Sequence, residues 1–427
     1  MTVRPAEPGA APGAARTGPG PRDTVIYAGA FEFPDRNAAA QRAVANACIF
    51  RDLGYRVILV GLSRDLPEGA PPHRLAADLL PFETWELPYP VGRLAWLRRI
   101  VSGADLLRLI EDHYADSLAG LILYDYPAVA QERLRRAARR RGAFAIGEAT
   151  EWYSVSRLRS VAAAVRNLDR PLRMRWVNRR MDGMIVASEF LRDFYAAAGQ
   201  PTVELPTLLA DRSPVAVPPA APGAGRPRRL FFAGSGFDPE SVAASVDGPK
   251  DRLDTVIEAL GAARAMGADF VLDVFGVTRP DYLAVRPDHA GLVADLGERI
   301  QFHGRQPRES IRRILAEADY SIFLRKDTRV SRAGFPTKFG ESVHFGTPVI
   351  TNALGSLTKY HVEGRTGWYI DYDDVQRAGR RLAEILNADS AEVSAMKDWC
   401  RASNLFHYAG YVAPVGRFMA TLSHRGP

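Results

Sequence analysis

The sequence contains little cysteine and has no long apolar segment. Its 427 residues include two cysteines, Cys48 and Cys400, which lie far apart along the chain. Two thiols can neither build a disulfide framework nor complete a zinc site. No apolar run reaches the roughly 18 residues that are needed to cross a bilayer. These absences exclude a disulfide-rich secreted domain and a spanning protein, and they favour a soluble, cytoplasmic protein with reduced thiols.

Lysine is scarce as well, because only five of the 56 basic residues are lysines. Random placement accounts for any one of them, but a lysine in a loop with other binding signals is a candidate functional group. Arginine-rich runs with helical spacing occupy residues 132–141 and 157–180. They are either solvated helix faces or a surface that contacts anionic lipid or attracts an anionic acceptor. No zinc-finger spacing or aromatic RNA-binding signature accompanies them, so we expect no nucleic-acid partner.

The composition divides the chain into two domains, since 427 residues exceed one ordinary core. Residues 1–22 are rich in Pro, Ala and Gly and are typical of a disordered tail. The segment 211–229, which is dense in Pro, Gly and Ala, breaks every hydrophobic period, and we expect a linker at 208–228. We therefore expect domains at 23–207 and 229–403. The amphipathic segment 404–427 should form a helix that packs back on the N-terminal domain.

Both predicted domains alternate strands with helices. Apolar runs at 24–31 and 55–61 flank an Ala-rich helical pattern at 37–54. The alternation restarts after the linker with a strand at 229–236 and a helix at 252–267. This order is typical of parallel α/β sheets, in which ligands bind at the carboxyl ends of the strands. The predicted fold class is α/β, with two Rossmann-like, doubly wound domains facing across a cleft.

The most informative stretch is SRAGFPTKFGESVHFGTPVITN at 331–352. It predicts a loop at 332–335 after the strand 320–325. Pro336 can begin a helix because its missing N–H needs no partner there. Gly346 then ends the helix.

A helix start with this sequence is suited to binding an anion. Its free N–H groups and the adjacent Lys338 suit a diphosphate. Glu341, one turn further, is placed to accept hydrogen bonds from the hydroxyls of a ribose. The same spacing also fits an ordinary α/β connector with a solvated Glu341, so both interpretations stay open.

The pattern P-T-K-F-x-E-x(4)-G-T-P-V-I resembles the donor-site signature of glycosyltransferase family 4, the retaining enzymes of the GT-B fold. The resemblance implies that Glu341 is the last glutamate of an E-x(7)-E motif and binds the ribose of a nucleotide. The first glutamate of that motif is replaced by Ala333. The loop that touches sugar and diphosphate matches Phe335, Pro336, Thr337 and Lys338.

Residues 231–260 resemble the family segment that carries an arginine and a lysine to the diphosphate. Lys250 matches the lysine. The place of the arginine is taken by Ser235 or Gly236. The missing positive charge could come from Arg252 or Arg305. The sequence FHGR at 302–305 resembles the base-binding corner. The resemblance therefore implies a donor site made of Gly29, Ser235, Gly236, Lys250, Gly304, Arg305, Phe335, Pro336, Thr337, Lys338 and Glu341.

The acceptor is expected against the N-terminal domain, where 31–47 and 148–154 resemble a bacterial subgroup that builds surface polysaccharides or decorates small molecules. The candidates lie at the ends of two adjacent strand-like segments, where Glu151 can bind a hydroxyl and Trp152 can pack on the acceptor. Alternatively, Trp152 is a core residue and Glu151 a helix cap. The predicted acceptor residues are Asp125, Tyr126, Glu151, Trp152 and Tyr153.

The implied activity is transfer of a sugar from a UDP-, GDP- or dTDP-sugar to a glycan, a lipid-linked acceptor or a small molecule, with retention of configuration. Lys250, Lys338 and Glu151 are the predicted catalytic residues. We expect no cofactor and no metal at the acidic cluster 371–374, and a cytoplasmic location with peripheral contact at the inner membrane face. Two alternatives stay open: a catalytically weak nucleotide-sugar-binding subunit, and another GT-B activity such as an epimerase or an inverting transferase.

Overall fold

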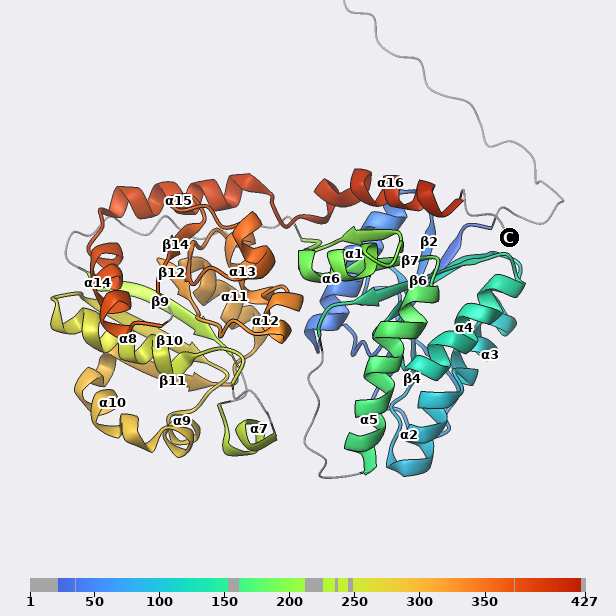
Figure 1. Cartoon of the computed structure of the whole chain (residues 1–427), viewed down its shortest axis with the longest axis horizontal. Helices are drawn as coiled ribbons and strands as arrows, with labels where there is room; N and C mark the ends of the chain where they lie inside the picture. The colour runs from blue at the N-terminus through green and yellow to red at the C-terminus, as the bar shows by residue number, and fades with distance from the viewer. Residues whose placement is uncertain are drawn as a thin grey trace, which may run out of the picture.

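Two sheets organise the chain in the computed structural model, and each belongs to one half of the molecule (Figure 1). Several predictions fall outside the described residues: residues 1–21 of the predicted tail, most of the predicted linker, and the site residues Tyr153, Ser235 and Gly236. The structure describes residues 22–34, 36–152, 161–211, 226–234, 237–244, 249–371 and 373–423.

The N-terminal sheet has the strand order β3-β4-β2-β1-β5-β6-β7-β8, and only the β3–β4 pair is antiparallel. Every residue of β1 is buried, as expected for a parallel strand with helices on both faces. The strands are β1 (Thr24–Ala28), β2 (Arg56–Ser63), β3 (His73–Arg74), β4 (Glu83–Pro88), β5 (Leu118–Tyr124), β6 (Phe144–Ala149), β7 (Gly183–Val186) and β8 (Thr202–Glu204). The helices are α1 (Ala38–Asp52), α2 (Gly92–Val101), α3 (Ala104–His113), α4 (Ala128–Arg140), α5 (Val161–Leu172), the π-helical η1 (Arg173–Val177), η2 (Asn178–Arg180) and α6 (Glu189–Ala196).

The C-terminal sheet is parallel, with the order β11-β10-β9-β12-β13-β14. Its strands are β9 (Arg228–Ala233), β10 (Phe270–Phe275), β11 (Ile300–Gly304), β12 (Tyr320–Ile322), β13 (Val349–Thr351) and β14 (Gly367–Tyr369). Its helices are α7 (Pro239–Ala244), α8 (Leu253–Ala265), α9 (Arg279–Val285), η3 (Pro287–His289), α10 (Ala290–Leu296), η4 (Gly297–Arg299), α11 (Arg308–Glu317), α12 (Arg329–Ala333), α13 (Thr337–His344), η5 (Gly355–Lys359), α14 (Val375–Leu386) and α15 (Ser390–Ser403). Two parallel-sheet, Rossmann-like halves confirm the predicted fold class.

The end of the chain crosses from the C-terminal half to the N-terminal half (Figure 1). After η6 (Tyr408–Tyr411), α16 (Val412–Ser423) packs against α1. Val415 and Phe418 of α16 are buried in the same hydrophobic cluster as α1. At the crossing, the backbone N–H of Leu209 donates to the carbonyl of Phe406 at 2.8 Å, so the two segments that join the halves are hydrogen-bonded to each other.

The sequence correctly placed most strands but was wrong about two local features near the proposed donor loop. The predicted loop at 332–335 is partly helical, because Thr328 caps α12 by accepting a hydrogen bond from the Ser331 N–H at 3.1 Å. Pro336 is the N-cap of α13, so the helix itself begins at Thr337. The strand-like segment that was expected to end at Glu151 and Trp152 already ends at Ala149, and the next two residues, Thr150 and Glu151, line the cavity between the halves.

A buried ion pair fastens the end of β6 to its surroundings. Arg42 Nε lies 2.6 Å from Glu148 Oε1, and both side chains are almost completely buried. The other guanidinium nitrogens of Arg42 donate to the carbonyls of Leu205 and Pro206 at 2.8 and 2.7 Å. Tyr27 donates its hydroxyl proton to the second oxygen of Glu148. One arginine thus ties α1 and β6 to the segment that follows β8.

Removing either charge of this pair should destabilise the protein strongly, since the remaining charge stays buried without its partner. We expect Glu148→Gln and Arg42→Met each to lower the free energy of unfolding by about 3–5 kcal/mol, measured by urea denaturation. Arg36→Ala is the control, because the Arg36–Asp65 pair is exposed and should contribute at most about 1 kcal/mol. Equal effects at the two sites would contradict the structural role of the buried pair.

Candidate functional site

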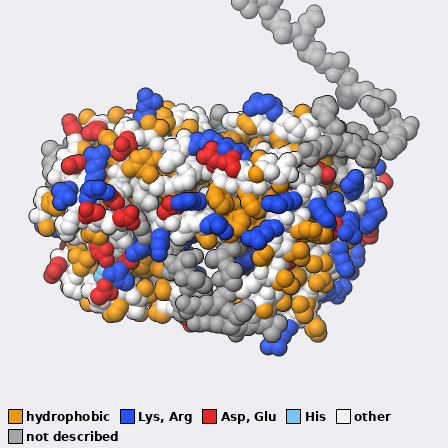
Figure 2. Space-filling model, in the orientation of Figure 1, with side chains coloured by type: hydrophobic (Ala, Val, Ile, Leu, Met, Phe, Trp, Pro, Cys, Tyr) orange, Lys and Arg blue, Asp and Glu red, His pale blue; other side chains and the backbone are white. Residues whose placement is uncertain are grey.

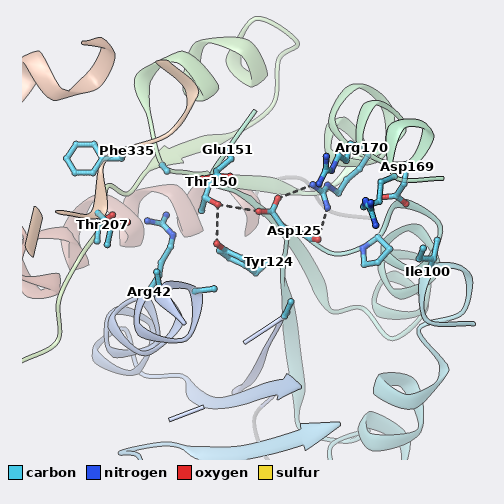
Figure 3. A pocket seen from close by; sticks show the side chains of 18 of the residues that line it. Arg42, Ile100, Tyr124, Asp125, Thr150, Glu151, Asp169, Arg170, Thr207 and Phe335 are labelled. Carbon is cyan, nitrogen blue, oxygen red and sulfur yellow. Dashed lines mark hydrogen bonds and ion pairs between the residues drawn. The ribbon is translucent and has the colours of Figure 1, made fainter. Parts of the chain in front are cut away.

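A cavity of about 530 Å³ opens at the carboxyl ends of β5 and β6, and both halves of the molecule line it (Figure 3). Most of its wall comes from the N-terminal half, whereas Thr337 is the first residue of α13 and Phe335 lies in the loop before that helix. Thr207, which follows β8, adds to the same side. The cavity therefore lies where the topology of two doubly wound sheets predicts a ligand site.

Asp125 is the first residue after β5 and has a left-handed backbone, with φ of 43°. Its carboxylate lies 3.3 Å from Arg173 Nη2 and accepts a hydrogen bond from the Thr150 hydroxyl at 3.3 Å. Arg173 also donates to the backbone carbonyl of Asp125 at 2.6 Å. Figure 3 shows Asp125 between Thr150 and the arginines of the α5 side. An unfavourable backbone held by several contacts is a common feature of functional sites.

Lys250 and Glu151 bridge the two halves of the molecule. Lys250 Nζ lies 2.8 Å from Glu151 Oε1, and the two side chains are 37% and 42% exposed. A methyl group on Gly334 would lie 3.8 Å from both Lys250 Nζ and the Thr150 carbonyl oxygen. The end of β6, the loop before α13 and Lys250 therefore converge at one point of the cleft. The sequence predicted both charged residues as site residues but did not predict that they pair.

Lys338 is held inside the C-terminal half. Its Nζ donates to the Ala233 carbonyl and to Asp251 Oδ2, both at 2.6 Å. Arg325 Nε lies 2.7 Å from the other oxygen of Asp251. Burial alone would raise the pKa of Asp251, but the two cations outweigh it and hold that pKa well below its usual range. Burial lowers the pKa of Lys338, and Asp251 opposes this effect. Lys338 thus ties α13 to the carboxyl end of β9.

Glu341 lies one turn into α13, and its contact with Arg308 was not predicted. Arg308 Nη2 is 3.4 Å from Glu341 Oε1 and also donates to the side chain of Gln41 on α1. Burial raises the pKa of Glu341, and Arg308 opposes the shift. Arg308 therefore connects α13 with α1 of the N-terminal half. Its only sequence signal is its position three residues after Arg305 in the segment that follows β11.

The remaining donor-site predictions lie at strand ends. Gly29 directly follows β1, and a methyl group there would come within 2.7 Å of the Phe31 ring and 2.9 Å of Tyr124. Gly304 ends β11 with φ of 60°, and the exposed Arg305 follows it. Only a residue without a side chain fits at Gly29.

Two predicted acceptor residues lie outside the lining of the cavity. Trp152 packs edge-to-face on Phe190 and Phe194 of α6, with ring centroids 5.8 and 5.2 Å apart. Tyr126 is buried in the core of the N-terminal half. Helix α2, which was not predicted as part of the site, contributes the large apolar side chains of Trp96 and Ile100 to the cavity wall.

The acidic cluster at 371–374 has internal roles. Asp374 caps α14 by accepting a hydrogen bond from the Arg377 N–H at 2.9 Å, and Asp371 forms an ion pair with the Arg377 side chain. Within the described ranges, no group of three or more His, Cys, Asp or Glu side chains is arranged to hold a metal ion. Over those same ranges, no helix is long and apolar enough to pass through a bilayer.

The two facing Rossmann-like domains and the cleft between them have the arrangement of the GT-B fold. Residues 238–399, which form most of the C-terminal half, match the family model described as glycosyl transferases group 1. No curated protein matches the sequence.

Solved structures resemble almost the whole chain. Sucrose-phosphate synthase from Thermosynechococcus elongatus matches with a TM-score of 0.60 and 18% identity, over 94% of this chain and 100% of the other. HepE from Anabaena in complex with UDP-glucose matches with a TM-score of 0.59 and 14% identity, over 93% and 99%. The α,α-trehalose 6-phosphate synthase of Burkholderia multivorans matches with a TM-score of 0.61 and 13% identity, over 95% of this chain and 99% of the other. At these identities the likeness establishes the fold.

A buried histidine packs against α13 and should make the free energy of unfolding depend on pH. His361 packs edge-to-face on Phe339 of α13, and its Nδ1 lies 2.9 Å from the Thr366 hydroxyl oxygen. Burial lowers the pKa of His361 to about 4. The unfolded chain therefore binds a proton at a higher pH than the folded chain does, and acid favours unfolding.

As the pH falls from 6.5 to 4, we expect protonation of His361 to lower the free energy of unfolding by up to about 3 kcal/mol. Urea denaturation across this range should show a shallower pH dependence for His361→Asn than for the wild type. His73→Asn, at an exposed position of β3, serves as the control and should keep the wild-type slope. An unchanged slope in His361→Asn would show that this ring does not set the acid stability.

Proposed function

We propose that the protein transfers a sugar from a nucleotide-diphosphate sugar to an acceptor hydroxyl in the cleft, with retention of configuration. The observation that carries the proposal is the Lys250–Glu151 pair. It joins the loop before α8, which holds Lys250, to the end of β6, close to the loop before α13. We propose domains at 23–207 and 229–403, with a linker at 208–228 and a returning segment at 404–427.

We propose a uridine diphosphate sugar as the donor, because HepE, which shares the fold, was solved with UDP-glucose. The first N–H groups of α13 have no acceptors within the helix and can bind the diphosphate. Glu341 would accept hydrogen bonds from the ribose, with Arg308 fixing its carboxylate. Gly29, Gly304 and Arg305 complete the proposed donor site among the described residues.

The departing diphosphate carries the charge that catalysis has to stabilise. We propose that Lys250 approaches it directly once it leaves Glu151, since the exposed ion pair costs little to open. Lys338 is already compensated by Asp251, so its role is to position the start of α13 and to add positive potential there. Donors aimed at developing charge in a closed site contribute about 3–4 kcal/mol each. No step in this scheme requires a metal ion.

The acceptor would enter the cavity from the N-terminal half. Three carboxylates line it, those of Asp125, Glu151 and Asp169. We propose that Asp125 or Glu151 accepts a hydrogen bond from the attacking hydroxyl. Trp96 supplies an apolar surface for a sugar or aglycone. We propose a surface polysaccharide, a glycolipid or a small natural product as the acceptor, and action at the cytoplasmic side of the membrane.

Glu341→Ala should weaken nucleotide-sugar binding and leave the fold intact. Loss of a charged hydrogen-bond acceptor predicts at least about a tenfold increase in Kd for UDP-glucose, measured by isothermal titration calorimetry. Glu309→Ala on the neighbouring α11 is the matched control and should bind as the wild type does. Unchanged affinity in Glu341→Ala would remove this residue from the donor site.

Lys250→Ala and Glu151→Gln should have different effects, the first on departure of the diphosphate and the second on transfer to the acceptor. We expect Lys250→Ala to lower kcat about 100-fold and to change the free energy of unfolding by at most about 1 kcal/mol, because the pair is exposed. Glu151→Gln should reduce transfer to the acceptor while donor affinity and slow donor hydrolysis persist.

Steady-state kinetics with a panel of nucleotide sugars, followed by NMR of the product anomer, provides the measurement for both variants. Full transfer activity in both would refute the roles of the pair. A product of inverted configuration would refute retention.

A further inference from the structure

Exposed apolar side chains are concentrated on one part of the N-terminal half. Among the described residues, eleven large hydrophobic side chains are exposed, and eight of them lie on or at the ends of α2, α4, α5 and η1. Leu94 is 84% exposed and Leu168 is 73% exposed. The eight side chains are Val91, Leu94, Leu97, Val101, Val129, Leu168, Leu172 and Trp176. We call these eight residues the apolar surface.

Helix α2 directs apolar side chains both into the cavity and towards solvent. None of its residues is fully buried. Trp96 and Ile100 line the cavity, whereas Leu94, Leu97 and Val101 recur at helical spacing and are exposed. An amphipathic helix normally buries its apolar stripe against its own domain. The outward stripe of α2 therefore requires a different explanation.

The exposed side chains of the other helices extend the same surface. Leu168, Leu172 and Trp176 follow one another four residues apart along α5 and η1. Helix α4 contacts both α2 and α5. Its first residue is tied to α5, because the Ala128 N–H donates to Asp169 at 2.8 Å. The three helices are therefore neighbours, and their apolar side chains belong to one part of the molecule.

Arginines accompany the apolar surface. Helix α2 carries Arg93, Arg98 and Arg99 and no acidic residue. On the α5 side, the guanidinium of the exposed Arg180 lies 3.3 Å from the centroid of the Trp176 ring. In Figure 2, hydrophobic and basic side chains lie close together over the region where Figure 1 places α5 and α2. Leucine and tryptophan flanked by arginine form the composition that rests on anionic bilayers.

We infer that the apolar surface docks on an anionic membrane. The leucines of α2 and α5 would enter the head-group region, and the arginines beside them would contact lipid phosphates. Because α2 and α5 also line the cavity, docking brings the proposed acceptor site next to the lipid head groups. This last step rests on the proposed function and selects a lipid-linked acceptor over a freely diffusing one. The docking itself does not depend on catalysis.

A second copy of the chain is a poorer occupant of this surface. A two-fold interface would place the arginines of α2 near those of its partner, and like charges oppose such an association. The central part of a protein interface is also depleted of charged residues. An anionic phospholipid bilayer can bury the leucines in its head-group region and bind the arginines through its phosphates.

Flotation with vesicles tests the docking. The full chain should bind vesicles of 70% phosphatidylcholine and 30% phosphatidylglycerol, and it should not bind pure phosphatidylcholine. Raising the salt from 0.1 to 0.5 M should weaken the binding, because screening reduces attraction to the lipid charge. Leu94→Glu combined with Leu168→Glu should lower the apparent affinity at least about tenfold. Arg93→Gln combined with Arg98→Gln should lower it by a similar factor.

The matched control is Met266→Glu combined with Val362→Glu, which places the same charges at exposed apolar positions of the C-terminal half. This control should bind vesicles as the wild type does, and all variants should keep the wild-type melting temperature. If the wild type fails to bind anionic vesicles, or if the Leu94/Leu168 variant binds equally well, the docking is refuted. A concentration-dependent dimer that the same variant abolishes would identify a protein interface and overturn the inference.

UDP-glucose titration without vesicles keeps the two proposals distinguishable. Vesicle binding without nucleotide-sugar binding would refute the proposed function and leave the docking intact. Nucleotide-sugar binding without vesicle binding would refute only the docking.

Discussion

The buried Arg42–Glu148 pair is the interaction on which the arrangement of the cleft depends. Glu148 precedes the end of β6 by one residue, so its position determines where Thr150 and Glu151 emerge. Arg42 also binds the carbonyls of Leu205 and Pro206, just before the chain leaves the N-terminal half. One desolvated cation thus fixes the helix α1, the proposed acceptor edge and the path to the second domain. The cost of burying it is offset because each of these partners is a charged or carbonyl oxygen.

The sequence predicted the fold well because the evidence for it is local and periodic. The apolar run that begins at Thr24 and the helix cap Asn37 each have signals that tertiary contacts do not override. Strands β3 and β4 were missed, because the segment before α2 has little apolar periodicity. The motif at 331–352 predicted the helix now seen as α13, whereas α12 depends on a capping hydrogen bond from Thr328 that the spacing did not reveal.

The site was less predictable, since pairing across domains leaves no sequence pattern. Lys250 and Glu151 are 99 residues apart. Nothing in either segment indicates that their side chains meet. Arg308 and Trp96 were missed for the same reason, because each gains its importance from a neighbour in space. Trp152 was predicted from its position after a strand, but α6 presents Phe190 and Phe194 to it, and aromatic packing determines where the ring lies.

The two halves are connected by two chain segments that are hydrogen-bonded to each other at Leu209, Phe406 and Tyr408. A single connecting segment would let one domain swivel freely about the other. Two segments fastened side by side permit opening and closing about the line that joins them, and they resist twisting. In the proposed function, such a connection would let the cleft widen for a donor and then bring Lys250 back beside Glu151.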